Sequence, residues 1–273
     1  HMGLMTYDVE QGSDEWLELR RGIVTASTVG SLITTRRLTA IDYDCPKCGA
    51  AANGECLSLR DPSKTVQSLH SERTAHAKRQ PSPLIIEPAS NDTSRDVTAK
   101  LVAERISGIT EETLTSYDMW RGKECEPLAR DKYSECFAPV KQTGFMVEDR
   151  WGFRIGFSPD GLVDDDGLLE IKSPRAKNHV KTVLSGGVPM EYMAQLQTGL
   201  LVSGREWVDF ISYSGGMKMW RKRVHRQPKW FEAIIAAVRL FEANAAEMMR
   251  LYDEATDGLP MTERMIPYEA EFS

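Results

Sequence analysis

The sequence predicts an α/β protein of the α+β type, with a small central mixed sheet flanked by helices and a small cysteine-rich insert. Its 273 residues, 41% of them hydrophobic, are enough to bury the core of one large domain. Helical periodicity alternates with short runs of β-forming residues, except where cysteines, prolines and small polar residues replace it. We therefore expect an inserted module at 36–88, between the N-terminal part of the main domain at 3–35 and its core and C-terminal helix at 89–273.

The N-terminal part predicts two short helices. Ser13 can cap the first, and Gly22 can end it after a turn that contains two arginines. The second begins near Thr25 or Ser27 and runs to about Ile33.

Helices and strands alternate after the insert. Asn91 can cap a helix that ends at Gly108, and a further helix covers 119–137, with Pro127 restricting where its first turn lies. Strand-like runs follow at 140–147, 153–157, 162–163 and 168–171. The remaining elements are a helix at 190–202, strands at 207–213 and 217–224, and a long amphipathic helix at 230–252.

Composition excludes two classes of protein. With 34 basic and 40 acidic residues the net charge is −6, so the chain does not coat nucleic acid through bulk charge. No apolar run reaches the roughly 18 residues that span a bilayer, and no basic-then-apolar leader begins the sequence. We expect a cytoplasmic protein without membrane contact.

The most informative stretch runs from Ser158 to Lys172. Asp160 closes one predicted strand, and Glu170 lies on the neighbouring strand of the predicted hairpin. Glu170 and Lys172 are two residues apart, so both side chains leave the same face. Two carboxylates and one ammonium on one patch are electrostatically unfavourable unless a divalent cation joins them, and carboxylate oxygens suit Mg²⁺ or Mn²⁺.

Such a cluster has the groups needed to hydrolyse a phosphodiester. A metal ion stabilises charge on the scissile phosphate, while Lys172 orients or helps to deprotonate the attacking water. The simpler interpretation is an exposed hairpin face that carries three charged residues without a function. The apolar neighbours Leu168, Leu169 and Ile171 argue against it, because a buried strand rarely carries charges that have no role.

These residues form the pattern of the PD-(D/E)xK nucleases, which have a restriction-endonuclease-like core. Further blocks narrow the match, and the chain resembles the phage lambda exonuclease, or YqaJ-like viral recombinase, family. The blocks are VEQGSDEW at 9–16 with LRRGIVTAS at 19–27, WRGKECE at 120–126, SPDG at 158–161 with LEIKSP at 169–174, and EYMAQLQ at 191–197.

The resemblance implies a catalytic group made of Asp160, Glu170, Lys172, Glu126 and Gln195. It implies a Mg²⁺ or Mn²⁺ site formed by the side chains of Asp160, Glu170 and Glu126 and the backbone carbonyl of Ile171. Glu124 is the alternative to Glu126, because either glutamate can face inward, and the family spacing favours Glu126.

The resemblance also implies that Arg20, Ser27 and Ser158 hold the 5′-terminal phosphate of the substrate. A guanidinium and two hydroxyls suit this role, because they form charge-assisted hydrogen bonds to a phosphate dianion. The alternative is structural, with Arg20 as a charge at the end of a helix and Ser27 as a helix cap.

The insert predicts a zinc site. The spacing C-x₂-C-x₇-C-x₁₃-H is formed by Cys45, Cys48, Cys56 and His70. Three thiolates and one imidazole complete a tetrahedral structural site, and an odd, clustered set of cysteines favours metal binding over disulfides. His76 is an alternative fourth ligand. An iron–sulfur cluster is the rival, and it would need Cys125 or Cys136 as a fourth thiolate.

The sequence leaves the role of the insert open. The basic residues that are candidates for phosphate contacts are Arg60, Lys64, Arg73, Lys78 and Arg79. The insert can equally dock a partner protein or serve only as a folded plug.

The function that the resemblance implies is a metal-dependent deoxyribonuclease, a 5′-to-3′ exonuclease that digests double-stranded DNA ends. It would leave 3′ single-stranded overhangs for phage or prophage recombination by strand annealing in a bacterial host. The implied partners are a single-strand annealing protein and further copies of the chain in a trimeric ring. The first alternative is an endonuclease or repair nuclease of the same core with different polarity. The second is a non-catalytic, zinc-dependent DNA-binding or adaptor protein.

Overall fold

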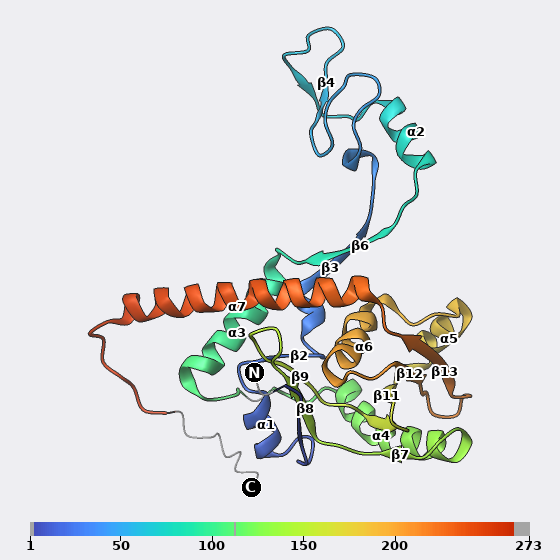
Figure 1. Ribbon diagram of the computed structural model, residues 1–273, viewed down its shortest axis with the longest axis vertical. Coiled ribbons are helices and arrows are strands. Elements are labelled where there is room, and N and C mark those ends of the chain that lie inside the picture. The colour runs from blue at the N-terminus through green and yellow to red at the C-terminus, as the bar shows by residue number, and fades with distance from the viewer. Residues whose placement is uncertain (1–2, 112, 265–273) are drawn as a thin grey trace.

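A five-stranded mixed sheet lies within the larger part of the molecule, in the order β13-β12-β11-β10-β7 (Figure 1). The computed structural model describes residues 3–111 and 113–264, so the last residues of the predicted main domain lie outside the described part. The strands are β7 (Val140–Lys141), β10 (Gly161–Val163), β11 (Gly167–Lys172), β12 (Trp207–Ser212) and β13 (Trp220–His225). Because β11 and β12 are parallel and the other neighbours antiparallel, the sheet is mixed, as the sequence predicts.

Helices cover both faces of this sheet. Ala129 and Tyr133 of α4 (Tyr117–Cys136) pack against Leu169 and Ile171 of β11 on one face. On the other face, Leu168 joins the main hydrophobic core with residues of α6 (Met190–Ser203) and α7 (Pro228–Thr256). Successive residues of β11 therefore point to opposite helix layers.

A second sheet has the order β1-β8-β9-β2, and α1 (Asp14–Arg20) packs beside it through Trp16 and Leu19. Its strands are β1 (Met5–Tyr7), β2 (Val24–Thr25), β8 (Phe145–Glu148) and β9 (Ile155–Phe157). The single strand predicted at 140–147 is wrong, because β7 and β8 belong to different sheets. A Cβ atom at Gly144 would lie 2.2 Å from the carbonyl oxygen of Val9, so glycine is required where the chain leaves one sheet for the other.

The predicted helices at 13–22, 91–108, 119–137, 190–202 and 230–252 are confirmed as α1, α3 (Asp92–Ser107), α4, α6 and α7. Ser13 and Asn91 cap α1 and α3, and Gly108 ends α3 in the left-handed conformation. The helix predicted from Thr25 or Ser27 is wrong, because Thr25 pairs with β9 and only Val29–Leu32 form a 3-10 helix, η1. Helix α5 (Ala176–Ser185) was not predicted.

A small module rises from the body on a two-stranded ribbon (Figure 1). The ribbon, which we call the stalk, pairs β3 (Ile33–Arg37) with β6 (Leu84–Pro88) in antiparallel register. The residues between the two strands, 38–83, are called the Cys–His module. It contains the 3-10 helix η2 (Ala40–Asp42), β4 (Cys56–Leu57), β5 (Thr65–Val66) and α2 (Ser71–Arg79). The division at 36–88 remains a prediction.

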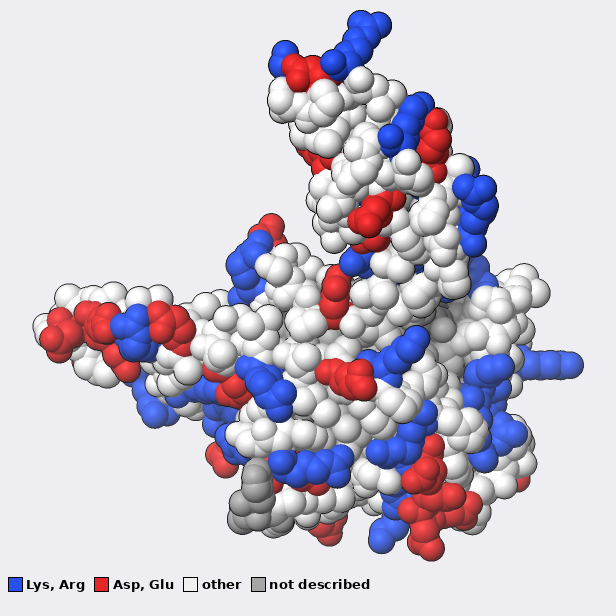
Figure 2. Space-filling view, turned by 45° about the horizontal axis from the view of Figure 1, so that its top comes forward, with Lys and Arg blue, Asp and Glu red and all other residues white. Residues whose placement is uncertain are grey.

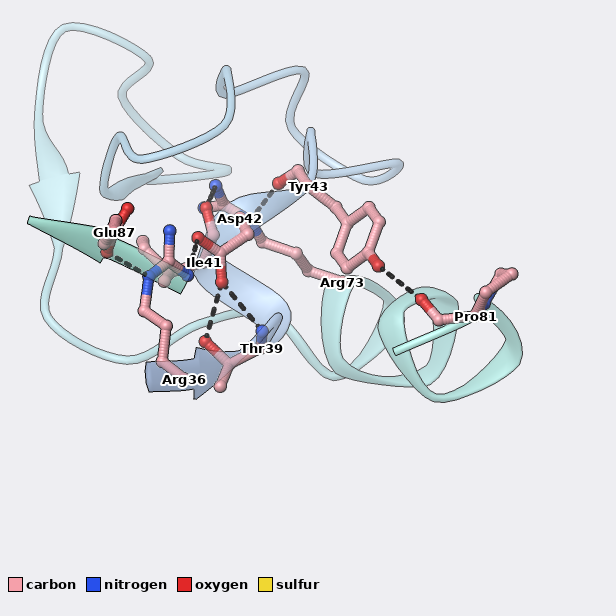
Figure 3. A network of polar contacts seen from close by, with 8 residues as sticks. All are labelled: Arg36, Thr39, Ile41, Asp42, Tyr43, Arg73, Pro81 and Glu87. Atoms are coloured by element: carbon pink, nitrogen blue, oxygen red, sulfur yellow. Dashed lines mark hydrogen bonds and ion pairs between the residues drawn. The ribbon is translucent and has the colours of Figure 1, made fainter. Parts of the chain in front are cut away.

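Polar contacts join the stalk to the module (Figure 3). Arg36 contacts Glu87 across the stalk at 3.1 Å and Asp42 of η2 at 2.9 Å. The hydroxyl of Tyr43 donates to the carbonyl of Pro81 at 3.2 Å, linking the two chain segments that enter and leave the module. These contacts tie η2 and the end of α2 to the top of the stalk.

In the part of the chain that the structure describes, no helix has the length and apolar character needed to cross a membrane.

Candidate active site and metal centre

Asp160 lies in the turn that leads into β10. Its Oδ2 atom accepts a hydrogen bond from the amide of Ile171 on β11 at 2.7 Å, which fixes the carboxylate beside the neighbouring strand. Its own carbonyl accepts from Nε of Arg130 at 2.9 Å, and Nε2 of Gln11 donates to the preceding carbonyl, that of Pro159, at 2.8 Å. Helix α4 and the N-terminal segment thus hold this turn in place.

Glu170 and Lys172 lie on β11 and share one face, as their spacing predicts. Nζ of Lys172 is 3.1 Å from Oε1 of Glu170 and donates to Oε1 of Gln195, on α6, at 2.8 Å. The ring of Tyr192, one turn before Gln195, lies 5.2 Å from the same ammonium. Strand β11 and helix α6 therefore position Lys172 together.

Glu126 faces these groups from α4. A cavity of about 770 Å³ is lined by Glu126, Asp160, Glu170, Ile171, Lys172 and Gln195, among others. Glu124 is exposed and does not line it. Arg130, four residues after Glu126 on the same helix, contacts the Glu126 carboxylate. The structure therefore brings all five predicted catalytic residues to one cavity and distinguishes the two glutamates of α4.

The cavity raises the pKa values of its buried carboxyl groups. Burial, followed by the negative charges of Glu170 and Glu126, raises the pKa of Asp160 well above its ordinary value. Burial also raises the pKa of Glu170, against the opposing charge of Lys172. For Lys172, burial opposes the charged form, but the charges of Glu170 and Asp160 outweigh it and raise the pKa of the ammonium. Two buried carboxyl groups, those of Asp160 and Glu170, thus lie together in the site, and Lys172 is the cation whose charge acts on both.

The donor set of the cavity fits a hard divalent cation. The carboxylates of Glu126, Asp160 and Glu170 and the carbonyl of Ile171 offer oxygen atoms on its wall. A divalent cation relieves the repulsion that raises the pKa values of the two buried carboxyl groups. Ser173 also lines the cavity, and its Oγ atom is buried without a hydrogen-bond partner among the described residues.

The three residues predicted to hold a terminal phosphate lie in one connected cluster. Arg20 donates to Ser27 at 3.3 Å, and its guanidinium lies 4.1 Å from the centre of the Trp16 ring. Nε1 of Trp16 donates to Oγ of Ser158 at 2.8 Å. Because Ser158 precedes Asp160 by two residues, the cluster adjoins the carboxylate cavity along the chain.

Two side chains that connect these groups, those of Trp16 and Thr25, were not predicted from the sequence. Trp16 links Arg20 to Ser158, and Thr25 contacts both Arg20 and Ser27. The spacing of Trp16 and Arg20, one helical turn apart, was a signal for the first of these contacts. Nothing in the sequence signals that Thr25 faces the cluster.

The module contains a candidate metal site formed by the four residues that the sequence predicts. The ligand atoms of Cys45, Cys48, Cys56 and His70 all lie within 4.8 Å of one another. In the described part of the chain they are the one group of three or more His, Cys, Asp or Glu residues that meets this distance, so the carboxylates of the cavity converge less tightly. His76 lies outside the group and stacks edge-on against Tyr43, while Cys125 and Cys136 are on α4.

The backbone of the module prepares the thiols for a cation. Burial raises the pKa of the Cys45 thiol. At Cys48 desolvation opposes ionisation, but amides such as that of Leu57, which donates to its sulfur at 3.3 Å, lower the pKa to about 6. Gly49 adopts a φ of +72°, a conformation that glycine favours, and its amide donates to the carbonyl of Cys45 at 2.9 Å. This is the tight turn that a zinc knuckle requires.

Arg73 is a structural residue and not a phosphate contact. Its side chain is fully buried at the centre of the module. Its guanidinium donates at 2.7–3.1 Å to four carbonyl oxygens, those of Ile41, Tyr43, Ala51 and Gly54. It also lies 3.5 Å from Sγ of Cys56, which places positive charge beside the thiols. Two of these contacts reach η2 and its C-cap at the top of the stalk (Figure 3).

The molecule has the fold of an alkaline exonuclease. The crystal structure of an alkaline exonuclease from Laribacter hongkongensis, LHK-Exo, matches with a TM-score of 0.63 at 25% identity, over 91% of this chain and 100% of that chain. The structure of LHK-Exo in complex with dAMP gives the same values. A phage-related exonuclease from Haemophilus somnus 129PT has a TM-score of 0.48 at 13% identity, over 84% of this chain and 96% of that chain.

Residues 84–206 match the family model described as the YqaJ-like viral recombinase domain. Residues 16–87 match the model described as "Putative DNA-binding phage zinc finger domain". A search of curated proteins finds no match. The predicted resemblance to the YqaJ-like viral recombinase family is confirmed, and the matches support a nuclease of the exonuclease type with a zinc-binding module.

Proposed function

We propose that this protein is a Mg²⁺- or Mn²⁺-dependent deoxyribonuclease that digests double-stranded DNA from the 5′ end and leaves 3′ single-stranded overhangs. The observation that carries the proposal is the gathering of Asp160, Glu170 and Lys172 in one cavity, with Glu126 and Gln195 beside them. A buried cluster of this composition has no role in a protein that only binds DNA, because its charges repel each other at a cost to stability.

The residues that would hold the metal are Asp160, Glu170, Glu126 and the carbonyl of Ile171. When bound, the ion supplies charge stabilisation to the scissile phosphate and a more acidic water. The raised pKa of Lys172 keeps its ammonium protonated, so its part is to orient water or phosphate oxygen by hydrogen bonding. Gln195 and Glu170 hold that ammonium in place.

We assign recognition of the 5′ end, and hence the 5′-to-3′ direction of digestion, to the cluster of Arg20, Ser27 and Ser158. Its guanidinium and hydroxyls match a terminal 5′-phosphate, and Ser158 precedes the carboxylate turn, so a bound end would lie next to the catalytic group. By family resemblance we also propose a cytoplasmic phage or prophage setting, a trimeric ring and a single-strand annealing protein as partner.

The test is the digestion of linear duplex labelled at one end and carrying either a 5′-phosphate or a 5′-hydroxyl, with closed circular duplex as the control. We expect Mg²⁺-dependent release of nucleotides from the 5′ end, faster with a 5′-phosphate, and no cleavage of the circle. Cleavage of the circle would instead identify an endonuclease, and release from the 3′ end would identify a nuclease of opposite polarity. No degradation under any condition would favour a non-catalytic binding protein.

A further inference from the structure

The cations of the Cys–His module and its stalk differ in whether their charge is neutralised. Four of the eight are engaged within the protein. Arg36 pairs with Asp42 and Glu87, Lys47 with Glu72, and Lys64 with Asp61. Arg73 is buried among backbone carbonyls. These side chains hold the module together and leave little free charge for a ligand.

Three exposed cations remain at the neck between the module and the body. Lys78 and Arg79 end α2, and no hydrogen bond or ion pair of their side chains occurs among the described residues. Arg37 ends β3 and donates to the carbonyl of Ser82 at 2.6 Å, which places it beside the segment that follows α2. We call Arg37, Lys78 and Arg79 the neck cations.

The chain around the neck cations lacks acidic residues. No Asp or Glu occurs between Glu72 and Glu87, a stretch that contains Lys78 and Arg79. Glu87 and Asp42, the acidic residues of the stalk and of η2, both contact Arg36. The neck is therefore positive, although the whole protein has a net charge of −6.

The tip of the module is different. Arg60 is exposed there, but Asp61 follows it directly and pairs with Lys64 at 3.5 Å. Acidic and basic side chains lie next to each other at the tip (Figure 2), whereas the acidic residues near the neck, Asp42 and Glu87, are both paired with Arg36.

The neck also lies on the side of the molecule that carries two helices of the carboxylate cavity. Helix α2 forms the right-hand side of the module in Figure 1, above the side of the body that carries α5 and α6. Asn178 of α5 and Gln195 of α6 line the carboxylate cavity. In Figure 2, Lys and Arg side chains follow this right-hand edge from the module toward the body.

We propose that the neck cations bind the phosphate backbone of the duplex whose end occupies the carboxylate cavity. The proposal rests on the proposed function and adds the surface through which the module contacts that substrate. Exposed arginine and lysine side chains of one sign make sequence-independent contacts to DNA phosphates. The module then provides a second binding surface for the duplex, and this surface is formed by the neck and not by the tip.

The test compares two double variants that each remove two positive charges, K78A/R79A at the neck and R60A/K64A at the tip. Binding to a long duplex with 5′-phosphates is measured by fluorescence anisotropy over a salt series, without a divalent cation that would support cleavage. For K78A/R79A we expect weaker binding and a slope of log affinity against log salt that is smaller by about 1.8. Adding R37A should reduce the slope by about 0.9 more, while R60A/K64A should bind like the wild type.

Zinc content and melting temperature check that each variant is folded. An unchanged slope in K78A/R79A, or an equal loss in R60A/K64A, would overturn the proposal. The rate of digestion by R60A/K64A should equal that of the wild type, because the tip is outside both the catalytic group and the neck. If the wild type fails to digest DNA, the proposed function fails, while the salt slopes still test the neck.

Discussion

The ammonium of Lys172 lies 3.1 Å from the carboxylate of Glu170, and its second contact is Oε1 of Gln195 at 2.8 Å. One partner is on the same strand and the other on α6, so the position of the ammonium depends on the packing of a helix against a sheet. Conversely, Glu170 is 3% exposed, and Lys172 is the cation it contacts. Each residue makes the burial of the other tolerable.

Replacing either member of this pair should abolish Mg²⁺-dependent digestion. For Glu170→Gln and Lys172→Ala we expect rates at least about 10²-fold lower, since each removes an interaction with the developing charge. Digestion of end-labelled duplex measures the rate, and circular dichroism checks the fold. Lys100→Ala, an exposed substitution on α3, is the control. Full activity in both variants would show that the cavity is not the catalytic site.

The two glutamates of α4 should differ in effect. Glu126 lines the cavity and Glu124 is exposed, so Glu126→Gln should lower the rate of digestion by about 10-fold or more. Glu124→Gln should leave it within a factor of about two. The Mg²⁺ concentration for half-maximal rate should rise for Glu126→Gln alone. The reverse order of effects would show that the other face of α4 supplies the carboxylate.

Arg20 should determine the preference for 5′-phosphorylated ends. In Arg20→Ala the ratio of rates on 5′-phosphate and 5′-hydroxyl duplex should fall toward one, because the guanidinium that pairs with the phosphate is lost. Arg21→Ala is the matched control, since Arg21 follows directly but contacts Thr110. If Arg20→Ala still prefers 5′-phosphorylated ends, or if Arg21→Ala loses that preference to the same extent, this role of Arg20 is contradicted.

Arg73 should be essential for zinc retention. Arg73→Met leaves four carbonyl oxygens without the donors of this buried guanidinium, which we expect to destabilise the module by about 3 kcal/mol. Release of zinc to a chromogenic chelator should become faster. Lys78→Met, on the same helix and exposed, should release zinc like the wild type. Equal rates for Arg73→Met and the wild type would argue that the buried guanidinium is dispensable.

Stability without Mg²⁺ should fall as pH rises. Burial, with the charges of Glu170 and Glu126, raises the pKa of Asp160 above its value of 3.8 in the unfolded chain. The folded state therefore binds the proton more tightly, and the stability this gives is complete below about 3.8 and is lost as pH rises through the raised pKa.

Asp160→Asn should flatten this dependence, because an amide cannot ionise yet can still accept from the amide of Ile171. Urea unfolding across a pH series gives the free energies. Parallel curves for the variant and the wild type would show that Asp160 is not the group responsible. Mg²⁺ should stabilise the wild type most at high pH, where the carboxylates are ionised.

Local signals predicted much of the fold. Caps at Ser13 and Asn91 and the glycine at 108 mark helix ends through short-range hydrogen bonds, so α1 and α3 were predicted within a residue or two. The hairpin of β10 and β11 follows from an acidic turn between two apolar runs. The separation of β7 from β8 was not predictable, because it depends on a backbone contact between Gly144 and Val9, far apart in sequence.

In the candidate site, too, local sequence patterns predicted some residues, while the roles of others depend on contacts between distant segments. Asp160, Glu170 and Lys172 are close in sequence, and strand alternation is enough to put two of them on one face. The Cys–His ligands likewise follow a short spacing. The roles of Arg73 and Thr25 depend on burial among distant segments, which a charge or a hydroxyl in a sequence does not reveal. Arg73 therefore looked like a phosphate contact, although every one of its donors is engaged inside the module.

The pairing of Ile33 with Pro88 brings the two ends of the stalk to adjacent positions on the body. A tight turn could therefore close this gap, and the fifty-odd intervening residues could be excised or exchanged as a cassette without altering the spacing of the remaining chain. Such a junction allows an enzyme to gain or lose an accessory module in a single insertion or deletion, while the residues of its catalytic site are unchanged.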